Sequence, residues 1–355
     1  MRVLRNVLLL CNLAVLLLTL MAYLAPHVPP EKIWFLQFAG MAYPFLLLLN
    51  IAFAFVWLFL RKRYFIISLI VILLGWSHVT NFVGFSLISK KAPTSAIKIL
   101  TYNVDNFSSL LKGSLRERRK DDFEKFITAE QPDIVCLQES FITSAEYKNR
   151  INQFPALAAY PYIFHPEEKG IAIFSKFPAA RSAKIIMKED RVETANGANY
   201  ADFQIRGKTM RLVITHLQSN SVRERTEDVI EDKFRSNTTR RTALNVIRKI
   251  RDMSYFRASQ SESIRRFIQK SPHPVIIAGD FNDTPQSYTY NQISSGLKDA
   301  FAEKGCGLGV TYGGIIPGLR IDYILVDPSL EVLSCKIPKV PFSDHYPVVA
   351  EIAFP

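Results

Sequence analysis

The chain has 355 residues, 48% of them hydrophobic, and a net charge of +12. This length allows about two domains. The first 90 residues hold seven of the 44 basic residues and one of the 32 acidic residues, so the remaining 265 residues carry a net charge of only +6. That excess is weak support for a nucleic-acid-binding protein. The four cysteines are scattered, which excludes a disulfide framework and a cysteine-rich zinc site, although a pairing of Cys306 with Cys335 stays open.

The first 90 residues contain three long apolar runs, at residues 7–25, 33–60 and 64–88. Each run reaches the roughly 20 residues with which a helix crosses about 30 Å of hydrocarbon. We therefore predict that residues 1–90 form a membrane anchor of about three transmembrane helices. An alternative for the first run is a cleaved signal peptide, because Arg2 and Arg5 precede it. Two further apolar runs and the lack of a small-x-small cleavage site favour the membrane span.

The basic residues around these runs predict the orientation of the anchor, since short cytoplasmic loops collect Lys and Arg. Arg2 and Arg5 flank the first run, and Arg61–Arg63 separate the second run from the third, whereas the loop between the first two runs has one Lys and one Glu. The N-terminus is therefore predicted inside. Three crossings would place residues 91–355 on the outer, periplasmic side of an inner or plasma membrane. Lysines close to residue 90 weaken this asymmetry.

After residue 90 the sequence becomes a series of short apolar runs, most of which end in polar residues. Such runs are typical of strands that are buried on both faces. Helix-like stretches lie between some of them, including Arg116–Ala129 and Asn237–Gln269. The pattern predicts an α/β fold in which helices cover the strands and polar residues gather at the strand ends. The polar stretches are Asn103–Asp105, Gln138–Ser140, His216, Asp280–Asn282, Asp322 and Ser343–His345.

A hard divalent ion would explain this gathering of oxygen ligands. Mg²⁺ prefers oxygen, keeps several waters and commonly takes one or two carboxylates from a protein. Glu139 and Asp344, with Asn103 or Asp280, can supply such a sparse shell. Of the six histidines, only two fall directly at strand ends, which suits acid–base or charge-stabilising chemistry better than zinc binding.

Six stretches of the sequence resemble, in order, the motif blocks of the endonuclease/exonuclease/phosphatase superfamily. They are LTYNVDNF, IVCLQES, ITHLQSN, IIAGDFND, RIDYILVD and SDHYPV, and they span nearly all of residues 97–355. This superfamily includes DNase-like nucleases, apurinic endonucleases, bacterial sphingomyelinases and inositol polyphosphate 5-phosphatases. The resemblance implies a four-layer α/β/β/α sandwich with two mixed β-sheets, in which the site lies at one rim. It also implies a Mg²⁺-dependent phosphate-ester hydrolase, with Mn²⁺ as a possible substitute.

The resemblance also implies roles for individual residues. Glu139 is similar to the principal Mg²⁺ ligand of the family, with Asn103 and Asp344 nearby, and the ion would offset charge on the phosphate and on the departing oxygen. Asp322 and His345 resemble the family's Asp–His pair, in which the imidazole takes a proton from water.

Three further residues complete the expected site. Asp280 is expected to share the proton-transfer role of His345, while Asn282 and His216 are expected to donate hydrogen bonds to the pentacoordinate centre. The expected route is in-line attack by water without a covalent intermediate.

Some residues near the motifs keep two interpretations. Asp105 is a second site acid or a turn residue, and Asp283 with Thr284 is expected to cap a helix rather than to take part in catalysis. Lys176 is expected to end a strand structurally rather than to contact phosphate. The arginines of the long helical segment either form a solvent-exposed face or include one residue that contacts phosphate. They are Arg240, Arg241, Arg257, Arg265 and Arg266.

The sequence leaves three hypotheses about function open. The first is a phosphate ester at the membrane, such as a lipid headgroup or another phosphorylated molecule, because the anchor holds the site near the bilayer. The second is extracellular nucleic acid, because arginines crowd the long helical segment. The third is a non-catalytic membrane scaffold, which clustered carboxylates disfavour since they repel one another without a metal.

Overall fold

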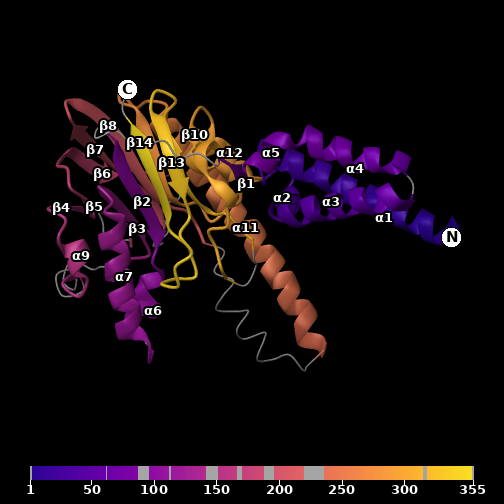
Figure 1. The fold of residues 1–355 in the computed structure, drawn as a ribbon, viewed down its shortest axis with the longest axis horizontal. Helices are drawn as coiled ribbons and strands as arrows, with labels where there is room; N and C mark the ends of the chain where they lie inside the picture. The colour runs from indigo at the N-terminus through magenta and orange to yellow at the C-terminus, as the bar shows by residue number, and fades with distance from the viewer. Residues whose placement is uncertain are drawn as a thin grey trace.

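The computed structural model describes residues 2–60, 62–86, 96–111, 113–140, 151–165, 170–187, 196–219, 236–314 and 318–353, without the side chains of residues 62 and 236–243. An elongated N-terminal helical unit projects from one side of a layered α/β unit (Figure 1). The boundary predicted between residues 90 and 91 lies outside the described residues.

The first of two six-stranded sheets carries the later motif blocks. Its order is β10-β12-β9-β8-β7-β6, with β8 and β9 parallel and the other neighbours antiparallel. The sheet is therefore mixed. The strands are β6 (Ala179–Lys184), β7 (Gly197–Ile205), β8 (Lys208–His216), β9 (Val275–Asp280), β10 (Lys298–Asp299) and β12 (Asp322–Val326).

The second sheet carries the first two motif blocks and the C-terminal strand. Its order is β13-β14-β2-β3-β5-β4, and only β2 and β3 are parallel neighbours. This sheet is also mixed. The strands are β2 (Ile97–Asn103), β3 (Ile134–Gln138), β4 (Tyr162–Phe164), β5 (Ala172–Ser175), β13 (Glu331–Lys336) and β14 (Val348–Ala353).

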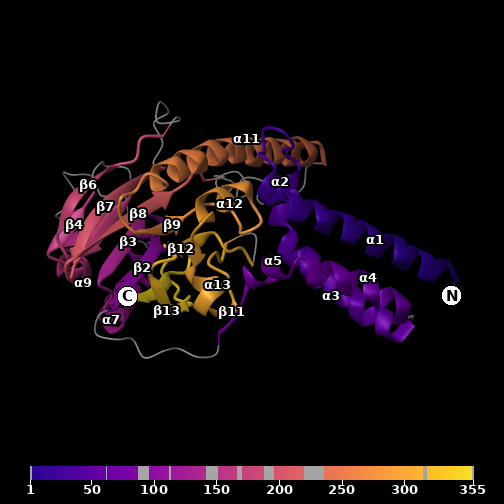
Figure 2. The same ribbon diagram turned by 90° about the horizontal axis from the view of Figure 1, so that it is seen from above.

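The two sheets pack face to face, because alternate side chains of both form one buried core, which includes Ile99, Cys136, Leu212 and Ile276. Helices cover the two outer faces, and Figure 2 shows the sheets between them. The helices over the second sheet are α6 (Ser108–Leu111), α7 (Arg116–Glu130) and α9 (Pro155–Ala158), and those over the first are α11 (Ser236–Ile268) and α12 (Tyr288–Ser294). The predicted α/β/β/α sandwich is confirmed.

Local sequence explains where the helices of this sandwich begin and end. α7 stops at Glu130 because Gln131 adopts the left-handed conformation, with φ of +50°, and its N–H bonds to the carbonyl of Ile127. Ser287 caps α12, since its side chain accepts a hydrogen bond from the Tyr290 N–H. The short α13 (Ala300–Lys304) and the 3-10 helix η2 (Asp105–Phe107) complete this unit.

The N-terminal unit contains α1 (Arg2–Leu24), η1 (Ala25–His27), α2 (Leu36–Met41), α3 (Tyr43–Leu60), α4 (Lys62–Leu74) and α5 (Trp76–Thr80). Within the described residues, two helices, Arg2–His27 and Tyr43–Leu60, are long and apolar enough to cross a membrane. The expectation of three such helices is not met. The third apolar run breaks at Gly75, and 13-residue α4 is only about 20 Å long at 1.5 Å per residue.

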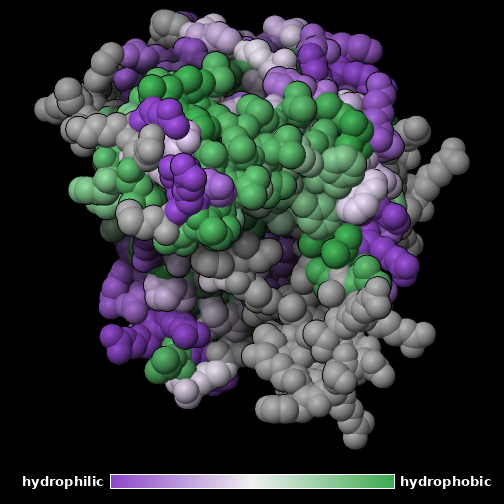
Figure 3. Space-filling view, turned by 90° about the vertical axis from the view of Figure 1, so that its right-hand side faces the viewer, coloured by the Kyte–Doolittle hydropathy of each residue, from purple (hydrophilic) through white to green (hydrophobic). Residues whose placement is uncertain are grey.

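Apolar side chains cover the outside of this helical unit. Leu10, Leu48 and Phe55 are 67%, 63% and 63% exposed. Figure 3, which looks at the molecule from the side of the helical unit, shows a broad hydrophobic surface bordered by hydrophilic residues. Polar side chains are instead paired inside: Asn12 donates to Ser68, and the Trp57 indole donates to Asn12. An apolar exterior of this size is unusual for a soluble protein.

Backbone hydrogen bonds join the helical unit to the sandwich. β1 (Val83–Phe85) pairs antiparallel with β11 (Cys306–Leu308). The Arg320 Nη1 donates to the Asn81 carbonyl at 2.6 Å, while its Nη2 contacts Asp299. The helical unit is therefore docked on the β12 side of the first sheet. Cys306 and Cys335 are both free, the first exposed and the second buried, so they form no disulfide here.

Candidate functional site

The first sheet places three predicted site residues in one row across adjacent strands. His216 ends β8 and lies opposite Asp280, which ends β9, and Asp280 lies opposite Asp322, which begins β12. Gly279 permits the close approach of β8 and β9, because a Cβ there would lie 1.9 Å from the Thr215 carbonyl oxygen. The strand register therefore delivers a histidine and two acids to the same sheet edge.

The second sheet supplies two more residues at the facing edge. Asn103 ends β2, and Glu139 directly follows β3, which runs parallel to β2. The Asn103 Nδ2 donates to Glu139 Oε1 and to Asp280 Oδ2, both at 3.0 Å, so this amide links the two sheets. Glu139 has a φ of +52°, a left-handed conformation that is strained for a residue with a side chain and is common at functional sites.

His345 enters the site from the loop before β14. Its Nδ1 lies 3.0 Å from Asp322 Oδ2 and 3.2 Å from Asp322 Oδ1, and its Nε2 lies 3.8 Å from Asp280 Oδ2. The Tyr312 ring packs edge-on against the imidazole, with centroids 5.0 Å apart. Thr311 fixes Asp322, because its Oγ1 accepts the backbone N–H of Ile321 and of Asp322. The predicted Asp–His pair is thus formed and buried.

His216 is buried and lacks a hydrogen-bond partner at either ring nitrogen among the described residues. Its Nε2 lies 3.4 Å from Glu139 Oε1 and 3.8 Å from Asp280 Oδ2, beyond ordinary hydrogen-bond distance. Leaving a buried N–H unsatisfied is costly, so native structures rarely do it. The ring is therefore free to donate to a bound anion.

The electrostatics of the site follow from burial and crowded acids. Burial, reinforced by the Asp322 charge, raises the pKa of Asp280 to about 6, although His345 and His216 oppose the shift. Burial alone would lower the pKa of His345, but the Asp322 and Asp280 carboxylates outweigh it and raise that pKa to about 10. Burial also raises the pKa of Glu139 and lowers that of His216. The His345 imidazolium is thus the charge that balances two buried acids.

The donor set fits a hard divalent cation. Glu139 is partly accessible, with 27% of its side chain exposed, and Asp344 and Asp105 are close enough to raise its pKa. The carboxylates of this site outnumber its one imidazolium, His345, so their negative charge would stabilise a bound cation. A second grouping, Asp280 with Asp322 and His345, has ligand atoms within 4.8 Å of one another. We assign the cation to Glu139 rather than to this second grouping, because the hydrogen bond between His345 and Asp322 already explains why its ligand atoms lie close together.

Asn282 lies beside Asp280 at a sharp turn with φ of +51°. Its N–H donates to Asp280 Oδ1 at 2.7 Å and its Nδ2 donates to the Leu217 carbonyl at 3.0 Å. The Asn282 Nδ2 carries a second hydrogen with no hydrogen-bond acceptor among the described residues, so the predicted donor role stays a prediction. Asp344 lies further out, half-buried, and lines a pocket with Asp105.

Sequence reasoning missed the residue that ties these strand-end loops together. Arg257 on α11 is 1% exposed; its Nε lies 3.2 Å from Asp283 Oδ2 and its Nη1 donates to the Gln218 carbonyl at 3.0 Å. Asp283 therefore pairs with an arginine, and its prediction as a helix cap is wrong, since Ser287 caps α12. Helical spacing alone did not distinguish Arg257 from its exposed neighbours.

Lys176, Arg265 and Arg266 have structural explanations, whereas Asp105 is both a turn residue and a neighbour of Glu139. Lys176 pairs with Asp133 at 3.0 Å at the opposite end of β3, away from the site, as expected for a structural residue. Arg265 donates to Gln292 and Arg266 to Ser263. Asp105 lies in a turn with φ of +43° and its N–H donates to Asn103 Oδ1. The side chains of Arg240 and Arg241 lie outside the described residues.

Comparisons with protein families divide the chain in two. The model of the Endonuclease/Exonuclease/phosphatase family matches residues 100–345, and a model of a domain of unknown function matches residues 5–82. No curated protein matches the chain significantly in sequence.

Solved structures share the fold of the sandwich at low sequence identity. D. rerio TDP2 in complex with a single-strand DNA product is 18% identical with a TM-score of 0.52, over 73% of this chain and 99% of that one. The catalytic domain of human Nocturnin with bound sulfate is 20% identical with a TM-score of 0.52, over 75% and 97%. A family protein from Bacteroides thetaiotaomicron is 17% identical with a TM-score of 0.53, over 75% and 100%.

The family match, which covers more than half of the chain, agrees with the two mixed sheets and with the motif blocks that meet at one edge. The chain therefore belongs to the endonuclease/exonuclease/phosphatase family and is a metal-dependent phosphoric ester hydrolase.

Proposed function

We propose that this protein is a membrane-anchored, Mg²⁺-dependent hydrolase of phosphate esters at the bilayer, with lipid headgroups or other phosphorylated molecules as substrates. One observation carries the catalytic part of the proposal: residues from six separate chain segments converge, and the buried His216 ring among them has no hydrogen-bond partner within the described residues. A phosphoryl oxygen is the acceptor that this ring lacks.

The metal would be held chiefly by Glu139, with Asn103 and Asp344 nearby. Bound there, a divalent cation would offset negative charge on the phosphate and on the departing oxygen. Asn103 positions Glu139, because its Nδ2 donates to Oε1 at 3.0 Å. Mn²⁺ has similar oxygen-ligand preferences and is expected to replace Mg²⁺.

The other residues act on the water and on the phosphoryl group. Asp280 accepts the proton of the attacking water, and the His345 imidazolium takes part in this transfer because its Nε2, 3.8 Å from Asp280 Oδ2, opposes the rise in the pKa of that carboxyl group. Asp322 holds the imidazole in one orientation through its Nδ1. His216 and Asn282 donate hydrogen bonds to the pentacoordinate centre, where one donor is worth roughly 2.7–4 kcal/mol. Water attacks in line, without a covalent intermediate.

The exposed apolar surface of the helical unit supports membrane attachment of residues 1–90, with residues 91–355 as the hydrolase domain. α1 and α3 have the length and composition of membrane spans. The start of α1, which carries Arg2 and Arg5, and the start of α4, which carries Arg63, lie at the end of the helical unit that is distal to the sandwich (Figure 1). By the positive-inside rule, that end is cytoplasmic. In this proposal α4 and α5 together, which lead the chain back to the sandwich (Figure 1), make the third crossing and leave the hydrolase domain on the outer side.

The activity is tested with full-length protein in detergent. We expect Mg²⁺- or Mn²⁺-dependent hydrolysis of bis(p-nitrophenyl) phosphate, and release of phosphorylated headgroups from vesicles of anionic phospholipid. Plasmid DNA serves as the competing substrate. DNA cleavage without lipid turnover would reverse the choice of substrate, and no turnover of any phosphate ester would contradict the catalytic proposal.

Topology is tested separately with reporter fusions. A reporter that is active only outside the cytoplasm, fused after Pro355, is expected to be active, whereas activity of a cytoplasmic reporter at the same point would contradict the outer location. A fusion after residue 61 provides the matched control, since it is expected to be cytoplasmic. Complete extraction of the protein by carbonate would argue against membrane spans.

Nucleic acid is the second candidate substrate. D. rerio TDP2, which shares the fold, was solved with a single-strand DNA product. The described part of α11 does not favour this substrate, because Arg257 is buried in an ion pair and Arg265 bonds to Gln292. A non-catalytic scaffold is disfavoured by the family match and by four buried or half-buried acids around one site.

A further inference from the structure

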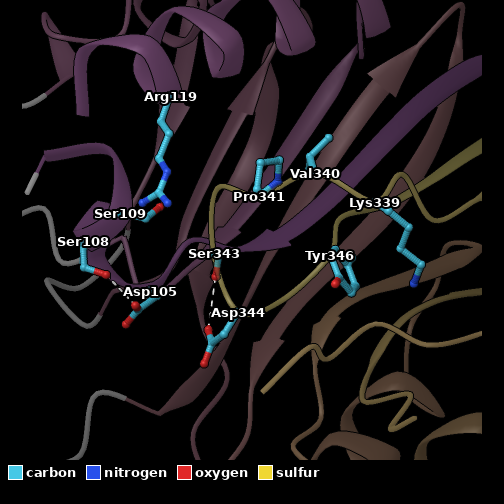
Figure 4. Close-up of a pocket in the computed structure, with 10 residues that line it drawn as sticks. All are labelled: Asp105, Ser108, Ser109, Arg119, Lys339, Val340, Pro341, Ser343, Asp344 and Tyr346. Atoms are coloured by element: carbon cyan, nitrogen blue, oxygen red, sulfur yellow. Dashed lines mark hydrogen bonds between the residues drawn. The ribbon is translucent and has the colours of Figure 1, made fainter. Parts of the chain in front are cut away.

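A pocket of about 660 Å³ opens next to the carboxylates of the proposed metal site. It lies between α6, α7 and the loop before β14, and Figure 4 shows its side chains. Asp344 and Asp105 contribute carboxylates to one part of its wall, whereas Arg119 and Lys339 contribute cations to other parts. Asp344 lines this pocket and is also close enough to Glu139 to raise its pKa, so the pocket adjoins the proposed metal site.

Arg119 is a cation without a counter-charge among the described residues. It is half-buried, and its guanidinium has no hydrogen bond or ion pair with any described residue. The other arginines at the start of α7 behave differently, since Arg116 pairs with Glu117 at 3.2 Å and Arg118 with Asp122 at 3.9 Å, both at exposed positions. Arg119 is the one of these three that lines the pocket.

Lys339 is held at another side of the same pocket. Its ammonium lies 4.2 Å from the centroid of the Tyr346 ring and donates to the Val310 carbonyl. An ammonium has three N–H donors, so these contacts orient it without using all of them. Hydroxyl groups of Ser108 and Ser343 also line the pocket. These two hydroxyl groups already donate to the carboxylates of Asp105 and Asp344, so the wall offers its two cations to an anionic ligand.

We propose that this pocket binds a second anionic group of the substrate, a phosphate or a carboxylate, while the scissile phosphate lies at the catalytic centre. This inference rests on the proposed function and narrows its substrate class to phosphate esters with a further negative charge in the same headgroup. Guanidinium and ammonium groups bind such anions through charge-assisted hydrogen bonds, and Arg119 offers a planar fork for two oxygens.

The charges favour a small dianionic headgroup over a nucleic-acid strand. A strand binds along a continuous track of cations, whereas this pocket presents two cations together with the carboxylates of Asp105 and Asp344. Those carboxylates repel a run of phosphates but suit a ligand whose anionic groups are separated by a neutral spacer.

The test is a comparison of α,ω-alkanediol monophosphates with the matching bisphosphates, with spacers of three to eight carbons. Calorimetry on the full-length protein in detergent with Mg²⁺ measures both dissociation constants without requiring turnover. For the best spacer we expect the bisphosphate to bind at least about tenfold more tightly, the effect of one good charge-assisted contact. The spacer length at the optimum measures the separation between the two anion sites.

Variants assign the preference to the pocket. Arg119→Gln and Lys339→Gln are each expected to reduce the preference for the bisphosphate to less than about threefold, since each removes one of two cations. Arg118→Gln is the matched control, because this neighbour on α7 is exposed and pairs with Asp122; it is expected to keep the full preference. Thermal unfolding of each variant checks its folding.

Several outcomes would overturn the inference. They are equal binding of monophosphates and bisphosphates, a preference that survives both variants, and a short oligothymidylate that binds more tightly than the best bisphosphate in an Arg119-dependent manner. Failure of the proposed function is distinguishable, because a protein that prefers bisphosphates but hydrolyses no phosphate ester contradicts catalysis and leaves the pocket assignment intact.

Discussion

Arg257→Met tests whether a buried ion pair holds together the loop after His216 and the loop that carries Asn282 and Asp283. Arg257 is 1% exposed and Asp283 is 7% exposed, and their side chains meet at 3.2 Å. The guanidinium also donates to the carbonyl of Gln218, two residues after His216. Methionine keeps most of the apolar stem but removes the charge and the donors, so Asp283 is left buried without its cation.

The expected loss of unfolding free energy is about 3–5 kcal/mol, the usual cost of removing one partner of a buried pair. Far-UV circular dichroism of the full-length protein in denaturant measures it, since all three tryptophans, Trp34, Trp57 and Trp76, lie in the helical unit and would not report on the sandwich. We also expect kcat for bis(p-nitrophenyl) phosphate to fall, because the loops that carry His216 and Asn282 lose a shared contact.

Two further variants make this result interpretable. Arg266→Met, at an exposed position on the same helix, is expected to change stability by less than about 0.5 kcal/mol. Adding Asp283→Asn to Arg257→Met is expected to recover part of the loss, because the unpaired charge is removed. A loss below about 1 kcal/mol for Arg257→Met, or no recovery in the double variant, would refute the reasoning.

Three other predictions concern the catalytic residues and the helical unit. His345→Ala is expected to lower kcat for bis(p-nitrophenyl) phosphate by at least about a hundredfold, and a loss under tenfold would remove its proton-transfer role. Asn282→Ala is expected to lower kcat by about 10²–10³-fold with little change in KM, as for a transition-state donor, and a change confined to KM would show ground-state binding instead. Deleting residues 1–90 removes the Asn81 carbonyl that accepts a hydrogen bond from buried Arg320. We expect the unfolding free energy of the sandwich to fall by about 1–3 kcal/mol and its Tm in a thermal melt to fall with it. An unchanged Tm would show that the sandwich folds independently of the helical unit.

The short apolar runs followed by polar residues were sufficient to predict an α/β fold, whereas the two-sheet sandwich was implied by the resemblance of six motif blocks to a known family. Parallel neighbours bring their carboxyl ends to one edge, as in β8 and β9, so residues at the ends of separate strands were expected to meet. His216, Asp280 and Asp322 do so within one sheet, and Asn103 joins them from the other. The placement of polar residues at strand ends was enough to predict that these side chains lie close together.

Features that depend on tertiary contacts were not predictable in the same way. The third apolar run has membrane-like composition, but it breaks at Gly75, where a Cβ would lie 2.0 Å from the hydroxyl oxygen of Tyr23. The pairing of β1 with β11 joins residues more than 200 positions apart, which no local pattern encodes. Arg257 likewise becomes distinctive only when Asp283 lies beside it. Charge and spacing along one helix could not identify that partner.

The central claim is that Glu139 and its neighbours form a hydrolytic site for a divalent cation. Mn²⁺ binding to the full-length protein, followed by electron paramagnetic resonance during a titration, tests it most directly, with Glu139→Gln as the variant and Glu130→Gln, whose side chain pairs with Lys336, as the control. We expect saturable Mn²⁺ binding in the wild type and the control, and at least about tenfold weaker binding in Glu139→Gln. Equal Mn²⁺ affinity in Glu139→Gln and the wild type would contradict the account.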